Sequence, residues 1–165
     1  MLKAAIIVSL TLLSAMAAAS PASAQGAPAA FEKKNYNYSE WAKGRFSEAV
    51  TVTGPGKTIF LAGVGAEDEN GTAGTILYKG DFAAQCKYAY EKITRLLDKH
   101  GATLGDVVKM VSYLTDVRYQ ADYGKCRVDA FGSNPLPAHT LLTISQLAWP
   151  GMIVEIDVTA IVPLK

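Results

Sequence analysis

The feature that most constrains the fold is an apolar stripe with helical spacing, which predicts a long amphipathic helix over residues 82–100. Its apolar face comprises Phe82, Cys86, Ala89, Ile93, Leu96 and Leu97. Asp81 is a suitable N-cap before this helix, and Gly101 follows it as a left-handed stop. A second, shorter helix is predicted over residues 119–132, with one face formed by Tyr123, Cys126 and Ala130. Both helices therefore need an apolar surface to pack against.

That surface is predicted to be a β-sheet. Alternating and β-branched residues predict strands over residues 48–54, 58–65, 106–117, 139–147 and 152–162, with a further short strand near 76–78. We expect the first two strands to form a hairpin across the turn "GPGK". Strands joined through helices become parallel neighbours with right-handed crossovers, so both helices cover one face of a mixed sheet. This is an α+β two-layer domain, and its uncovered apolar sheet face predicts an oligomer.

The first residues are typical of an exported protein. Lys3 precedes an apolar run over residues 4–19, and small residues at 22–24 form a cleavage site. The run is shorter than the roughly 20 residues that span a bilayer, which argues against an uncleaved anchor. We therefore expect residues 1–24 to be a signal peptide, residues 25–45 a partly flexible N-terminal leader, and residues 46–165 the domain. The predicted location is periplasmic or secreted, with no membrane segment after cleavage.

The charges and cysteines exclude some partners. The chain has 16 Lys and Arg against 15 Asp and Glu, and removal of Lys3 would balance them. It lacks the basic stripe that phosphate-backbone binding requires, so no nucleic-acid partner is expected. Cys86 and Cys126 lack metal-site spacing. An oxidising compartment allows a disulfide between the two helices, but we expect two buried thiols instead.

Two carboxylates stand out in the last predicted strand, "MIVEIDVTAIV". Glu155 and Asp157 are two positions apart and so point to the same face, whereas Val154, Ile156 and Val158 face the helices. A carboxylate on a strand face is usually only solvated. Here apolar residues share the face, so we expect a carboxylate at the edge of an apolar interface, with a raised pKa suited to proton transfer.

Several segments together resemble the RidA family, the reactive intermediate deaminases also called endoribonuclease L-PSP-like proteins. They are "QCKYAYEKITRLLDKHGATLGDVVKMVSYLTDV", "LPAHTLLTISQL", "IVEIDVTAIV", "FSEAV" and "FLAGVG", in the family's order and spacing over residues 46–162. The resemblance implies a homotrimer of chorismate-mutase-like subunits with clefts between them. It also implies hydrolysis of 2-imino acids and their enamine tautomers to 2-oxo acids and ammonia, without a cofactor or metal.

The resemblance assigns site residues position by position. Glu155 matches the glutamate that positions or activates water, Phe46 matches an aromatic wall residue, and Gly63 matches a glycine whose backbone approaches the ligand. His139 stands where active members carry an arginine that grips the substrate carboxylate. The backbone at Thr140 and Leu141 would lie near the ligand.

Three family residues are replaced: the arginine by His139, a serine by Ala62 and an asparagine by Gly124. Loss of a charge-assisted hydrogen bond costs roughly 1.5–3 kcal/mol, although a protonated imidazole, with a reference pKa of about 6.5, could restore part of it. His139 is thus either a group that orients a small carboxylate or imine, or a cleft-edge residue without a role.

Two functional readings follow. The first is a RidA-like trimer that binds small metabolites between its subunits and hydrolyses imines, weakened by the missing arginine. The second is a non-catalytic small-molecule-binding or chaperone-like trimer on the same fold. A ribonuclease is a poor third reading, because the charge is balanced and no candidate nucleophile is apparent.

Overall fold

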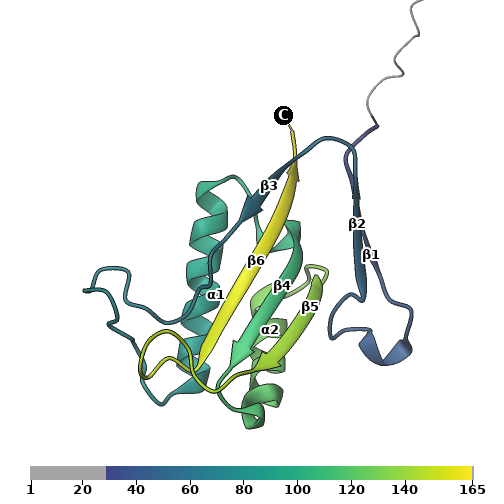
Figure 1. Ribbon diagram of the computed structural model, residues 1–165. Helices are drawn as coiled ribbons and strands as arrows, with labels where there is room; N and C mark the ends of the chain where they lie inside the picture. The colour runs from purple at the N-terminus through teal and green to yellow at the C-terminus, as the bar shows by residue number, and fades with distance from the viewer. Residues whose placement is uncertain (1–28, 165) are drawn as a thin grey trace, which may run out of the picture.

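The computed structural model of the protein describes residues 29–164 (Figure 1). Its elements are β1 (Glu32–Tyr36), η1 (Glu40–Ala42), β2 (Ala49–Thr53), β3 (Gly56–Phe60), α1 (Phe82–Lys99), η2 (Leu104–Asp106), β4 (Val107–Leu114), η3 (Val117–Tyr119), α2 (Gln120–Phe131), β5 (Ala138–Thr143) and β6 (Val154–Pro163). The predicted signal peptide lies outside the described residues. Within residues 29–164, no helix combines the length and the apolar character that crossing a bilayer requires.

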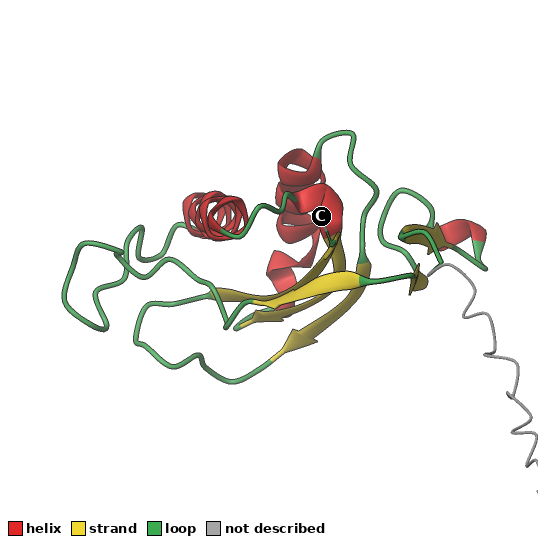
Figure 2. Cartoon of the chain, turned by 90° about the horizontal axis from the view of Figure 1, so that it is seen from above, coloured by secondary structure: helices red, strands yellow, loops and turns green. Residues whose placement is uncertain are grey.

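The main sheet has four strands in the order β3-β6-β4-β5. β4 and β5 run parallel and are joined through α2, whereas the other neighbours are antiparallel. Both long helices cover one face of this sheet, and no helix among residues 29–164 covers the other (Figure 2). The domain is therefore the predicted α+β fold with a mixed sheet and two helices on one face.

The boundaries of α1 follow from its sequence. The side chain of Asp81 accepts a hydrogen bond from the backbone N–H of Ala84 at 3.0 Å, which satisfies one of the free donors at the start of the helix. Gly101 has a φ of 73°, which ends the helix at little steric cost. The expected apolar face is buried against the sheet, at Phe82, Cys86, Ala89, Ile93 and Leu97.

The predicted hairpin between β2 and β3 is wrong. β2 pairs with β1 in a separate two-stranded sheet, and β3 pairs with β6 in the main sheet. Figure 1 shows the β1–β2 pair standing beside the main sheet, with the chain crossing from one to the other after β2. The turn at Gly54 therefore redirects the chain instead of closing a hairpin, because each of the two strands pairs with another strand.

The segment expected to be a flexible leader contains β1. This strand is polar, "EKKNY", so it has no apolar alternation that would reveal it in the sequence. It is held by distant contacts: the Asn35 side-chain amide donates to Ser47 Oγ at 2.9 Å and to the Leu136 carbonyl at 3.0 Å. The Lys33 ammonium donates to the Val107 carbonyl at 3.2 Å.

The short strand expected near residues 76–78 does not form. Its only ladder contact within residues 29–164 is an isolated bridge between Ile76 and Glu67. Ile76 is nevertheless buried, in a small apolar cluster with Ala66 and Met152. The apolar character of this segment thus reflects packing beneath a loop, not a place in the sheet.

The expectation of two free thiols is also wrong. Cys86 of α1 and Cys126 of α2 form a disulfide, with a Cα–Cα distance of 6.5 Å. The two apolar helix faces do pack side by side, and they approach closely enough for the bond that the sequence only allowed. The disulfide ties the two helices together over the sheet.

Candidate functional site

The two main candidate residues, Glu155 and His139, lie on opposite faces of the main sheet. Glu155 of β6 is paired with Tyr113 of β4, and His139 of β5 is paired with Met110 of β4. Tyr113 and Met110 are three positions apart on one strand, so their side chains point in opposite directions. Met110 is fully buried beneath the helices. His139 therefore lies on the helix side, and Glu155 lies on the open side.

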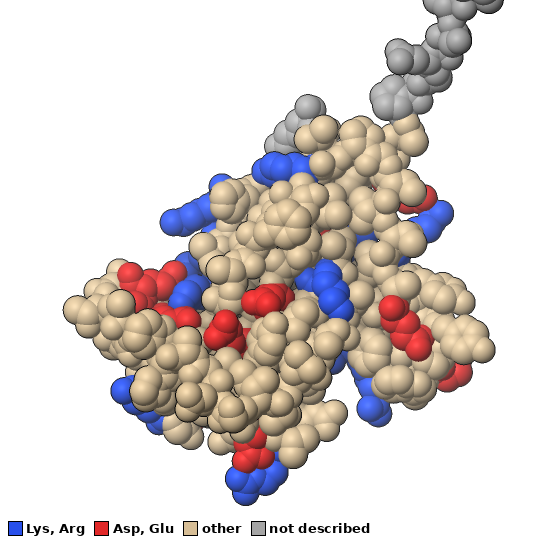
Figure 3. Space-filling view, viewed as in Figure 1, with Lys and Arg blue, Asp and Glu red and all other residues tan. Residues whose placement is uncertain are grey.

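The open face carries a small acidic group. Glu155 and Asp157 are both half-buried there, as the alternation predicted. Figure 3 looks onto this face and shows acidic side chains in its middle. The Tyr113 hydroxyl donates to Asp157 at 3.1 Å, whereas Glu155 has no hydrogen-bond partner within residues 29–164. Glu155 is thus the carboxylate that is free to engage a ligand or water.

The surroundings of Glu155 favour its protonated form more than water does. Burial, and then the nearby charges of Glu67 and Asp157, raise the pKa of the Glu155 carboxyl above its usual range. Gly63 lies directly against this carboxyl group, because a Cβ at position 63 would overlap Glu155 Oε1. The structure therefore brings together the predicted pair Glu155 and Gly63.

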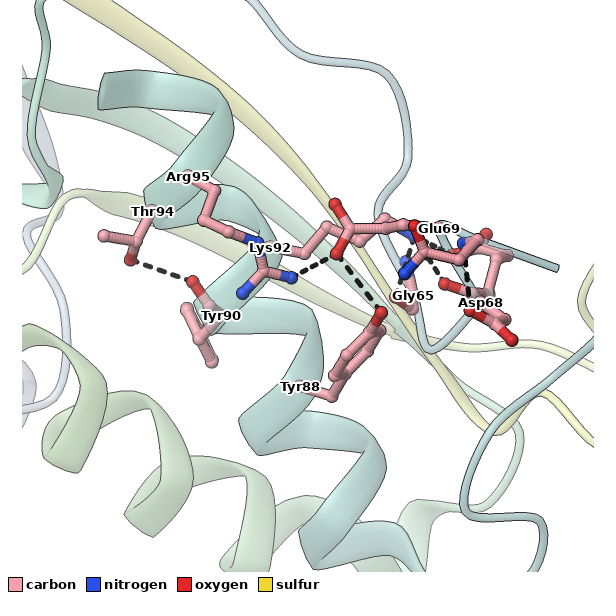
Figure 4. A network of polar contacts seen from close by, with 10 residues as sticks. Gly65, Asp68, Glu69, Tyr88, Tyr90, Lys92, Thr94 and Arg95 are labelled. Carbon is pink, nitrogen blue, oxygen red and sulfur yellow. Dashed lines mark hydrogen bonds and ion pairs between the residues drawn. The ribbon is translucent and has the colours of Figure 1, made fainter. Parts of the chain in front are cut away.

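Glu67 and Lys92, which sequence reasoning missed, shape the acidic side of the site. Lys92 Nζ donates to Glu67 Oε2 at 2.8 Å, and the backbone N–H of Gly65 donates to the same oxygen at 3.0 Å. Farther along the loop, Tyr88 and Arg95 of α1 both contact Glu69 (Figure 4). Glu67 appeared in the sequence only as part of an acidic loop, and nothing local indicated that α1 anchors that loop beside β6.

His139 is embedded in a polar network beneath α2. Nδ1 lies 2.5 Å from Nη1 of Arg127, and Nε2 lies 3.0 Å from Oγ of Ser112. A guanidinium can only donate, so Nδ1 accepts and the proton sits on Nε2, from which it is donated to Ser112. Ser112 contacts the Tyr123 hydroxyl, which lies 2.9 Å from the Tyr90 hydroxyl.

This environment keeps His139 uncharged. Burial, and then the positive charges of Arg127 and Lys109, lower the pKa of His139 to about 3. The imidazole is therefore neutral at physiological and mildly acidic pH. This disfavours an anion-binding imidazolium at position 139, because Nδ1, the nitrogen that would have to gain the second proton, already accepts a hydrogen bond from Arg127.

A cavity of about 750 Å³ opens beside His139. Phe46 and Leu141 line it, together with Gly124, where the resemblance placed an asparagine. Phe46 is held at the edge of the sheet, because the next residue, Ser47, donates its N–H to the Pro137 carbonyl at 2.9 Å. Its ring meets Trp41 edge to face at 5.3 Å.

Thr140 is not part of this cavity. Its side chain points to the open face, where its hydroxyl accepts a hydrogen bond from Lys109 at 2.7 Å. Glu155 and Gly63 do not line the cavity either. Within one subunit the predicted residues therefore form two groups, an acidic one on the open face and an apolar, cationic one beneath α2.

Arg127 is the cavity residue that sequence reasoning did not identify. It is only 6% exposed, and it joins His139 to the backbone carbonyl of Arg45. A signal was present: Arg127 follows Tyr123 by four positions, so a charged side chain shares the buried face of α2. Within residues 29–164, no group of three or more His, Cys, Asp or Glu could hold a metal ion.

Comparison with known proteins agrees with this architecture. Residues 38–162 match the family model described as Endoribonuclease L-PSP. A RutC family protein of Pyrococcus abyssi is 32% identical over 118 residues, which is 71% of this chain and 86% of that protein.

Solved structures are similar as well. A conserved Rid family protein of unknown function, YyfB of Yersinia pestis, superposes with a TM-score of 0.67 at 25% identity, covering 79% of this chain and 98% of that one. RidA from the Antarctic bacterium Psychrobacter sp. PAMC 21119 superposes with a TM-score of 0.57 at 28% identity, covering 73% and 91%.

Proposed function

Since the chain belongs to the endoribonuclease L-PSP family, we propose that it is a RidA-like homotrimer that hydrolyses small imines or enamines to oxo compounds and ammonia. The observation that carries this proposal is the half-buried Glu155, which has a raised pKa, no hydrogen-bond partner among the described residues, and the bare backbone of Gly63 against it. This is the environment that a proton-transfer group needs.

The open sheet face supports the trimer. Phe60 of β3 is 77% exposed there and Leu142 of β5 is 44% exposed, which is costly for a face in water. A neighbouring subunit packed on this face would bury both side chains. It would also cover the acidic group, so that the cavity of one subunit could meet Glu155 of another in the clefts that the family resemblance implies.

Glu155 would serve as the proton carrier in hydrolysis. The water oxygen adds to the imine carbon while the carboxylate takes a proton from that water and delivers it to the nitrogen. The resulting carbinolamine then collapses to the oxo compound and expels ammonia. A carboxyl group with a raised pKa suits both directions of transfer, because it binds and releases a proton closer to neutral pH.

Whether the protein hydrolyses its ligand or only binds it depends on the charge available in the cleft. A neutral histidine at position 139 lacks the charge of the family arginine, and this favours the second candidate, a non-catalytic small-molecule-binding trimer.

Export is also part of the proposal, with cleavage after Ala24. The Cys86–Cys126 disulfide supports it, because such bonds persist in oxidising compartments.

The test is ammonia release from 2-imino acids generated in situ, with the mature protein checked by light scattering for three times the subunit mass. Glu155→Gln should lower the rate by about 10²–10⁴-fold. Asp157→Asn is the matched control on the same strand and face, and it should lower the rate far less. Negligible release by the wild-type trimer would favour the binding protein, and a stable monomer would remove the inter-subunit cleft. RNA cleavage that persists in Glu155→Gln after repurification would instead revive a ribonuclease.

A further inference from the structure

Arg127 is a buried cation without an acidic partner in the part of the chain that the structure describes. Its hydrogen-bond acceptors are the neutral imidazole of His139 and the carbonyl of Arg45, each at 2.5 Å. The guanidinium carbon also lies 5.6 Å from the centre of the Tyr123 ring. No carboxylate within residues 29–164 forms an ion pair with it.

This arrangement leaves hydrogen-bonding capacity unused. A guanidinium has five N–H donors in a planar fork, and its known acceptors take up two of them. Nε is buried and has no hydrogen-bond partner among the described residues. A buried charge that lacks a counter-ion is strongly unfavourable, so an anion supplied from outside would satisfy a need that the fold leaves open.

The cavity beside Arg127 has the electrostatics and the shape for such an anion. Its charged lining consists of Arg45, Lys125 and Arg127 against a single carboxylate, Asp129. His139 also lines the cavity, and because it is neutral it adds no charge to the lining. The lining therefore carries an excess of positive charge, which concentrates small anions.

Much of the remaining lining is apolar, and Gln120 and Tyr123 add polar atoms. Trp41 and Phe46 form an edge-to-face pair at the cavity, and Leu141 and Val128 add aliphatic surface. Gly124 widens it, since a Cβ at that position would meet no atom within 4 Å. A volume of about 750 Å³ accommodates a ring or branched chain beside the charged group.

We propose that Arg127, from helix α2, binds the carboxylate of a small acid with an aromatic or bulky apolar body, and that His139 supports Arg127 as an uncharged hydrogen-bond acceptor. The anion-binding guanidinium of this protein would then come from α2 and not from strand position 139. As a statement about the substrate, this inference rests on the proposed function, whereas binding itself can be measured without any turnover.

The experiment is titration calorimetry on the mature, disulfide-bonded protein with three probes: phenylacetate, its neutral isostere phenylacetamide, and acetate. Phenylacetate should bind at least about ten-fold more tightly than phenylacetamide, the minimum expected for a charge-assisted pair. It should also bind more tightly than acetate. Equal affinity for phenylacetate and phenylacetamide, or no binding of either, would overturn the role of Arg127, and equal affinity for phenylacetate and acetate would overturn the apolar body.

Variants locate the site. Arg127→Gln should weaken phenylacetate binding about ten-fold or more and abolish the preference for the charged probe. Arg118→Gln is the matched control, because Arg118 is exposed beside Asp116 and does not line the cavity. Retention of the preference in folded Arg127→Gln would contradict the proposal.

A second variant covers the case in which Arg127→Gln does not fold. Gly124→Phe should place a ring in the cavity, because a Cβ at position 124 meets no atom within 4 Å, so we expect the protein to fold and lose phenylacetate binding. Unchanged binding would show that the ligand lies elsewhere. Binding that depends on Arg127 without ammonia release would uphold this inference while refuting the hydrolase, and ammonia release that ignores Arg127 would do the reverse.

Discussion

Nδ1 of His139 accepts a hydrogen bond from the guanidinium of Arg127, and this places a neutral ring and a buried cation side by side at 2.5 Å. The contact determines which residue can carry charge at this end of the sheet. The packing accommodates one cation here, and that cation is Arg127 of α2. The substitution that best matches the family pattern should therefore be harmful in this protein.

His139→Arg is expected to lower the free energy of unfolding by several kcal/mol, because it sets a second guanidinium against Arg127 in a buried site. It should not raise ammonia release, although a guanidinium at position 139 is what the family resemblance implies. Urea unfolding of the disulfide-bonded protein and the imine assay measure both effects. His139→Asn, which keeps a neutral acceptor, is the control. A stable His139→Arg variant with about ten-fold faster hydrolysis would contradict the expectation.

Acid should destabilise the protein through His139. The pKa of this group is about 3 in the folded state and about 6.5 when unfolded, so the unfolded state binds more protons between these values. Stability from this source is complete above pH 6.5 and is lost as the pH falls toward 3. Between pH 7 and pH 5 the expected loss is about 2 kcal/mol. Unfolding at a fixed protein concentration tests this, and His139→Asn should show a shallower pH dependence, since all other groups are shared.

The disulfide should contribute substantially to stability. It closes a loop with a sequence separation of 40, for which chain entropy alone gives about 4 kcal/mol. The double variant Cys86→Ser with Cys126→Ser should unfold at correspondingly lower urea, and reduced wild type should behave similarly. Thiol titration of denatured, unreduced protein should find no free thiol. Two reactive thiols under those conditions would exclude the bond.

Gly63→Ala should impair hydrolysis by displacing Glu155, since the new methyl group would overlap Glu155 Oε1. Ammonia release should fall markedly while phenylacetate binding at Arg127 changes much less, because Gly63 does not line the cavity that holds Arg127. Gly124→Ala is the control for the effect of a glycine-to-alanine change on stability. Its methyl group projects from α2 and meets no atom within 4 Å, so it should raise the free energy of unfolding by about 0.5–1 kcal/mol. Full activity of Gly63→Ala would argue against the contact between residues 63 and 155.

Much of the architecture could be predicted from local pattern. The apolar spacing over residues 82–100 identified α1, and the Asp81 cap and Gly101 stop located its ends. Alternation in β6 assigned Glu155 and Asp157 to the face opposite Val154 and Ile156. These predictions hold because the direction of a side chain on a helix or strand depends on the backbone period, which neighbouring residues alone determine.

Partners distant in the chain decided the rest. β1 carries no apolar alternation and exists through its pairing with β2, and β3 joined β6 instead of forming a hairpin. The two cysteines became a disulfide because their helices meet closely enough.

The sequence by itself determined the helices, most strands, the orientation of Glu155 and the family resemblance. Only the tertiary structure decided the strand partners, the disulfide and the charge of the site. The reason is clearest at His139, whose sequence position suggested a group that could be protonated. Arg127 lies 12 positions earlier and reaches His139 only after α2 folds onto the sheet, and burial together with that cation keeps the imidazole neutral. A strand period determines where a side chain points, whereas its protonation depends on the solvent it loses and the charges it meets, and both are set by folding.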